Sequence, residues 1–173
     1  IQATDTYLFF AVSGSQFVSS TNQPPWVLPG THSVLVFDIS APNGDVSQKG
    51  YATTAGFVAD KFKMNLKDGV LSVVSQTQPG WTPTGLAPTV TQLETFSLAN
   101  PNAPQRLAAL PIITNETVFA TRYDGDRAYI VTFRQVDPLW IVDLKDPAKP
   151  VIRGELQVPG WSSYIHPMGD RLL

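Results

Sequence analysis

Cysteine is absent from this chain of 173 residues, and histidine occurs only twice. The missing thiols exclude disulfide bonds, thiolate nucleophiles and metal sites built on cysteine. Charged residues make up only 15% of the chain, below the ~25% that is usual for soluble domains. The net charge of −2 also gives no basic surface of the kind that nucleic-acid-binding proteins carry. We therefore expect no nucleic-acid partner.

Long apolar runs and helical periodicity are also lacking. No run approaches the ~18–20 apolar residues that cross a bilayer, and no basic amphipathic stretch suggests docking on a membrane surface. The chain begins with Ile1 and ends with two leucines inside a strand-like run. We interpret it as a processed or partial chain from a longer exported precursor, and we expect it to be secreted or held at the cell surface.

A segment that occurs three times is the main feature that is present. The copies read VLVFDISAP at 34–42, LETFSLANP at 93–101 and LWIVDLKDP at 139–147. Each is an apolar run, typical of a buried strand, that leads into a polar turn with a proline. The residues before the turn, at 38, 97 and 143, are 59 and 46 positions apart. A strand-and-turn repeat of this length is typical of a β-propeller blade.

The sequence therefore predicts an all-β protein, a β-propeller of about three four-stranded blades in an incomplete ring. The whole chain, 1–173, is expected to be one partial propeller domain. Its units are expected near the following ranges: blades at 32–77, 91–136 and 138–173, and the end of a preceding blade plus a loop at 1–31.

The polar ends of the repeats are predicted to be structural turns. Asp38 and Asp143 are placed to accept hydrogen bonds from the backbone of the turn that follows. Asp146 and Pro147 are expected to fix the last turn, because proline presets φ and aspartate closes an Asx turn. The alternative is that Asp38 and Asp143 bind a ligand at the mouth of the central channel.

Three stretches carry a resemblance to a known family. The runs at 126–144 and 154–167, with a weaker stretch at 56–71, resemble a family of secreted bacterial and archaeal β-propeller domain proteins. The third copy of the repeat also resembles the Leu-Val-Ile-Val-Asp repeat of surface propellers. This resemblance implies a propeller and secretion, and it implies no particular enzymatic activity.

Three tryptophans are the candidate binding residues. Trp26 lies in a proline-rich loop, and Trp81 and Trp161 each follow a Pro-Gly pair. Exposed aromatic side chains in loops can stack on a sugar or anchor a protein partner. The alternative is that each tryptophan packs between blades as a wedge.

Carboxylates provide the remaining candidates. Asp124 and Asp126 flank Gly125 with a spacing that could suit calcium, although too few ligands are present for an EF-type loop; we expect no cofactor and no other metal. With Asp137 and Glu155 they could also form a carboxylate pair for glycan cleavage. We expect a non-enzymatic extracellular scaffold that binds a protein or polysaccharide, and other subunits could complete the ring. The alternative is a glycan-active hydrolase or lyase with carboxylates at the channel mouth.

Overall fold

A computed structural model describes residues 1–14, 17–18, 26–27, 31–82, 85–133, 137–158, 165–169 and 171–172. Strands dominate these residues, and the helical element among them is one short 3₁₀ turn, η1 (Lys61–Lys63). Within the same residues, the structure contains no helix with the length and apolar character needed to span a membrane.

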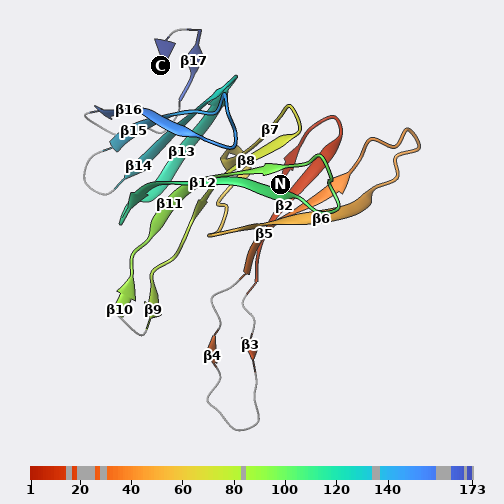
Figure 1. Ribbon diagram of the computed structural model, residues 1–173, viewed down its shortest axis with the longest axis horizontal. Coiled ribbons are helices and arrows are strands. Elements are labelled where there is room, and N and C mark those ends of the chain that lie inside the picture. Colours follow the sequence, from red (N-terminus) through yellow and green to blue (C-terminus); the bar gives the residue numbers. More distant parts are fainter. Residues whose placement is uncertain are drawn as a thin grey trace.

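Three four-stranded antiparallel sheets form the body of the protein (Figure 1). In each sheet the strands are hydrogen-bonded in chain order, so each sheet is a meander. The first sheet contains β1 (Gln2–Ala3), β2 (Tyr7–Gly14), β5 (Thr31–Asp38) and β6 (Ser47–Thr54). The second contains β7 (Met64–Lys67), β8 (Val70–Gln76), β11 (Val90–Ser97) and β12 (Gln105–Thr114). The third contains β13 (Thr117–Asp124), β14 (Arg127–Phe133), β15 (Asp137–Asp143) and β16 (Val151–Val158).

Three short hairpins extend this pattern. One consists of β3 (Phe17–Val18) and β4 (Trp26–Val27), and lies between the second and third strands of the first sheet. Another, β9 (Gly80–Thr82) with β10 (Gly85–Ala87), occupies the same place in the second sheet. The pair β17 (Pro167–Met168) and β18 (Arg171–Leu172) follows the third sheet. The prediction of an all-β, propeller-like fold is confirmed, and the described residues do not close a ring.

The repeated segment forms the third strand of every sheet, namely β5, β11 and β15. Each sheet therefore starts two strands before the repeat. The units expected at 32–77, 91–136 and 138–173 divide the strands differently, because each of them starts close to the third strand of a sheet. A repeat fixes the period of a propeller, but it does not say which strand comes first in a sheet.

The core lies between successive sheets. One cluster joins Phe9, Val34 and Val36 of the first sheet to Leu71 and Phe96 of the second. A second cluster joins the opposite face of the second sheet, with Val74 and Leu93, to the third sheet. Side chains alternate between the two faces of a strand, and most of β8 and β14 is buried on both faces. Packing on both faces thus explains why the apolar residues of these strands do not simply alternate with polar ones.

Candidate functional site

The meander topology sorts the loops onto two ends of the stack. The connection between the second and third strands, and the connection from the fourth strand to the next sheet, leave from the same end, which we call the arm end. The short turns between the first and second strands, and the loops between the third and fourth strands, lie at the opposite end, which we call the turn end. Both inserted hairpins belong to the arm end, and Figure 1 shows β3–β4 and β9–β10 reaching away from the sheets on the same side.

Two of the three tryptophan candidates lie in the arms. Trp26 is in β4, where it pairs with Val18, and Trp81 is in β9, where it pairs with Leu86. The backbones of these two residues are described, whereas their side-chain positions are not. Trp161 lies outside the described residues, in the connection that leaves the third sheet after β16. The sequence placed these residues in loops; the structure adds that the two described arms start from the same end of the stack.

Hydrogen bonds fix the bases of the two hairpin arms. At the first arm, His32 Nδ1 lies 2.9 Å from Ser13 Oγ across β2 and β5. At the second arm, the backbone N–H of Val90 donates to Thr77 Oγ1 at 2.8 Å, and the Thr77 N–H donates to the Val90 carbonyl. Each arm therefore leaves the sheet from a defined pair of strands, which keeps its two halves together.

The turn end is organised by side chains that accept backbone hydrogen bonds. Asp38 Oδ1 accepts from the N–H of Ser40, and Asp143 Oδ1 accepts from that of Lys145, both at 2.9 Å. Asp146 Oδ1 accepts from the N–H of Ala148 at 3.0 Å in the turn that contains Pro147. These contacts are those of Asx turns, in which the side chain substitutes for a backbone acceptor.

Asp38 and Asp143 each also form an ion pair with a basic side chain on the following strand. Asp38 lies 3.5 Å from Lys49 Nζ on β6, and Asp143 lies 3.0 Å from a guanidinium nitrogen of Arg153 on β16. Hydrogen bonds to Ser40, and then the charge of Lys49, lower the pKa of Asp38; the backbone N–H of Lys145, and then Arg153, lower that of Asp143. A lowered pKa is the opposite of what a general acid near neutral pH requires.

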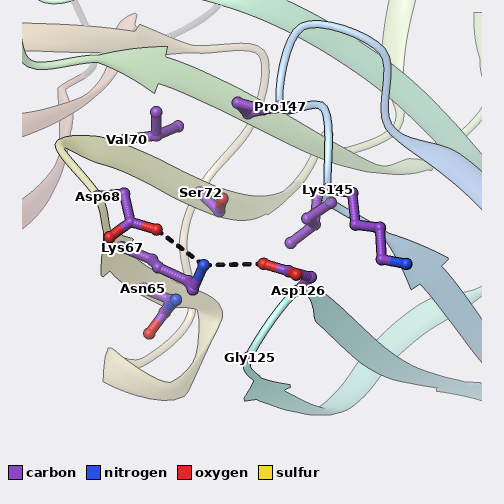
Figure 2. A pocket seen from close by; sticks show the side chains of 10 residues that line it. Asn65, Lys67, Asp68, Val70, Ser72, Gly125, Asp126, Lys145 and Pro147 are labelled. Atoms are coloured by element: carbon purple, nitrogen blue, oxygen red, sulfur yellow. Dashed lines mark hydrogen bonds and ion pairs between the residues drawn. The ribbon is translucent and has the colours of Figure 1, made fainter.

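Figure 2 shows a cavity at the turn end, between the second and third sheets. Its volume is about 180 Å³, and its lining includes the β7–β8 turn, the β13–β14 turn and the loop after β15. Lys67 Nζ lies 2.8 Å from a carboxylate oxygen of Asp68 and 2.8 Å from one of Asp126. The hydrogen bonds to Asp126 and Asp68 raise the pKa of Lys67. This lysine therefore links the turns of two neighbouring sheets.

The carboxylates considered for calcium or glycan chemistry have different surroundings. Asp126 is paired with Lys67, Asp124 is exposed at the end of β13, and Glu155 is exposed on β16. The side chain of Asp137 lies outside what the structure describes. Among the described residues, no three histidine, aspartate or glutamate side chains come together as a metal site would require.

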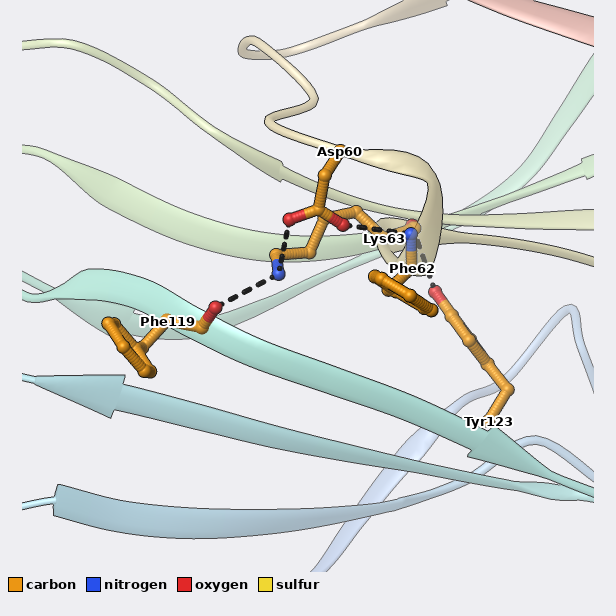
Figure 3. Close-up of polar contacts among 5 residues, drawn as sticks. All are labelled: Asp60, Phe62, Lys63, Phe119 and Tyr123. Atoms are coloured by element: carbon orange, nitrogen blue, oxygen red, sulfur yellow. Dashed lines mark hydrogen bonds and ion pairs between the residues drawn. The ribbon is translucent and has the colours of Figure 1, made fainter. Parts of the chain in front are cut away.

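Two buried charges were missed in the sequence. Glu94 is fully buried, and its Oε2 accepts hydrogen bonds from the backbone N–H of Ala55 at 3.0 Å and from Ser75 Oγ at 2.8 Å. Lys63 is 2% exposed and donates to Asp60 Oδ2 and to the carbonyl of Phe119, both at 3.1 Å (Figure 3). A signal existed for Glu94, because the other two copies of the repeat have Leu35 and Trp140 at this position.

Comparison with known proteins places this architecture in a family. The β-propeller domain family matches residues 9–173. An uncharacterized protein of Methanocaldococcus jannaschii is 51% identical over 57 residues, which are 33% of this chain and 9% of that protein. An uncharacterized protein of Archaeoglobus fulgidus is 54% identical over 52 residues, which are 30% of this chain and 8% of that protein.

The chain thus matches less than a tenth of the length of either relative. No solved structure matches it. The family match covers nearly the whole chain and agrees with the stacked four-stranded meanders that the structure shows. The chain therefore belongs to the β-propeller domain family.

Proposed function

We propose that this chain is a non-enzymatic interaction module that works outside the cell and binds a protein or polysaccharide through its arm end. The observation that carries this proposal is the pair of hairpin arms, which extend from the same end of successive sheets and each include a tryptophan. A rigid sheet stack that presents loops is a common way to build a recognition surface. Aromatic side chains are the usual anchors of such surfaces.

The arm-end proposal is tested by removing the two indole rings. In the double variant Trp26→Ala, Trp81→Ala, we expect binding to immobilised cell-envelope polysaccharide, or to purified envelope protein, to weaken by about tenfold or more, as for interface anchors in general. Surface plasmon resonance measures this change. Tyr51→Ala serves as the matched control, because Tyr51 is 60% exposed on β6 and lies outside both arms. Equal loss of binding in both variants would contradict the proposal.

A second proposal concerns a partner for the first sheet. Leu8 and Phe10 of β2, with Leu35 and Phe37 of β5, lie on the face opposite the first core cluster and are only half-buried. The corresponding face of the third sheet is covered by the second sheet, and Ile130 there is fully buried. We propose that another four-stranded sheet, supplied by a neighbouring subunit, packs on this face of the first sheet. Such packing would extend the incomplete ring.

Sedimentation velocity tests the subunit proposal. We expect the protein to self-associate as its concentration rises, and Phe10→Lys to leave a folded monomer, because a buried lysine without a partner opposes apolar packing. Val46→Lys is the control: Val46 is 60% exposed in the β5–β6 loop, away from this face. A wild-type protein that stays monomeric at every concentration would overturn the proposal.

A further inference from the structure

The first strands of the three sheets meet at a second cavity, which involves neither arm and shares only Asn65 with the lining of the turn-end cavity. Its volume is about 250 Å³. Gln2 of β1, Asn65 of β7 and Arg122 of β13 each line it, so every sheet contributes at least one residue from its first strand. The turn η1 adds Lys61 and Phe62 to the lining. The cavity therefore lies along the edge on which the three sheets converge.

Two polar groups in this lining have no partner. Thr121 is 6% exposed, yet its buried hydroxyl makes no hydrogen bond within the described part of the chain. The buried Nε of the neighbouring Arg122 also lacks a partner there. Buried polar side-chain atoms are nearly always hydrogen-bonded, and an orphaned group requires an explanation. Both groups lie on β13 beside the cavity, where a ligand that reaches them would supply the missing hydrogen-bond partners.

The charge of the lining defines the chemistry of that ligand. Lys61 and Arg122 are its charged residues, and among the described residues no carboxylate forms an ion pair with either of them. Asp60, which caps the start of η1, is already hydrogen-bonded to Lys63 and to the N–H of Phe62, as Figure 3 shows. The Lys61 ammonium lies 5.2 Å from the centroid of the Phe62 ring. The cavity thus presents positive charge without an internal counterion.

We propose that this cavity binds an oxyanion, such as the carboxylate, phosphate or sulfate group of a small ligand. A guanidinium offers donors in a fixed planar arrangement that fits such groups, and Nε is one of these donors. The Thr121 hydroxyl can donate to a second oxygen, and the Lys61 ammonium adds a point charge. The site is independent of the arm-end proposal, since it involves neither hairpin.

Isothermal titration calorimetry with sodium acetate, phosphate and sulfate, against chloride at constant ionic strength, tests this proposal. We expect saturable binding at one site per chain, and the tightest of the three anions identifies the chemical class. Arg122→Gln should raise the Kd by about tenfold or more, as expected when a charge-assisted hydrogen bond is lost. Arg127→Gln is the matched control, because Arg127 is exposed on β14 and lies outside this cavity; its Kd should equal that of the wild type.

Thr121→Val separates a binding role from a structural one. Valine has a similar shape but lacks the hydroxyl, which has no partner in the free protein. We therefore expect the unfolding temperature without anion to stay the same or rise, while the Kd increases severalfold. Three results would overturn the site: no saturable binding of any of the three anions by folded wild-type protein, an unchanged Kd in Arg122→Gln, or an unchanged Kd in Thr121→Val.

Discussion

Replacing Gly56 with alanine should lower the free energy of unfolding by about 3 kcal/mol, near the upper end of the usual cost of overpacking. A Cβ atom at this position would fall on the backbone carbonyl of Gln76, well inside van der Waals contact. The backbone there cannot move aside, because the N–H and carbonyl of Phe57 exchange hydrogen bonds of 2.9 and 3.0 Å with those of Gln76. The methyl group would thus push the segment that follows β6 away from the end of β8.

The matched control is Gly154→Ala. Gly154 is also in a strand, β16, but a Cβ there would meet no atom within 4 Å. We expect this variant to keep wild-type stability or gain a little, because alanine loses less conformational freedom on folding. Thermal unfolding followed by circular dichroism measures both. A loss of about 3 kcal/mol should lower the Tm by about 6–12 °C for a domain of this size. Equal Tm values for the two variants would show that the contact at Gly56 is not tight.

The position of Gly56 also shows which parts of the fold could be predicted from sequence. Period and strand content were readable, because the apolar runs of β5, β11 and β15 recur with similar turns after them. The strand at which each sheet begins was not, since a repeat can be cut at any strand without changing its period. The close approach of Gly56 to Gln76 joins residues 20 positions apart, one in the connection after β6 and the other at the end of β8, and a lone glycine in a sequence gives no sign of such a contact.

The same limit applies to the functional candidates. The turn residues Asp38 and Asp143 have a local pattern, because an Asx turn involves residues only two positions apart. The cavity at the first strands has no such local pattern. Its residues Gln2, Lys61 and Arg122 come from three regions of the chain and meet only when the sheets stack. An arginine without an ion-pair partner cannot be recognised until its neighbours are known. Sequence therefore identified loops and turns more readily than a site between sheets.

The second large effect is expected at the ion pair between Glu94 and Arg106. A guanidinium nitrogen of Arg106 lies 3.2 Å from Glu94 Oε1 and donates at 2.7 Å to the carbonyl of Thr53 in the first sheet. Oε1 has no hydrogen bond from any other described residue, and Glu94 is fully buried. The guanidinium of Arg106 also lies 5.6 Å from the centroid of the Phe96 ring. Arg106, whose own side chain is 45% exposed, thus pairs with a fully buried carboxylate and joins two sheets at once.

Arg106→Met should therefore destabilise the protein by about 3 kcal/mol, the lower end of the cost of leaving a buried charge without its partner. Urea unfolding at neutral pH measures this loss. Arg153→Met is the matched control: Arg153 is 64% exposed and pairs with Asp143 at the surface, where an ion pair contributes only about 0–1 kcal/mol. Similar losses in the two variants would show that burial of Glu94 does not set the cost.

A double variant distinguishes the unpaired charge from the loss of arginine packing. Arg106→Met combined with Glu94→Gln removes the negative charge while it keeps an oxygen to accept from Ala55 and Ser75. If the unpaired charge of Glu94 causes the loss of stability, the double variant should be more stable than Arg106→Met alone, because no ionised side chain is then left unpaired between the two sheets. If the contacts of Arg106 with Thr53 and Phe96 are the cause, the second substitution should restore nothing. The direction of this difference decides whether the junction between the first two sheets depends mainly on charge or on packing.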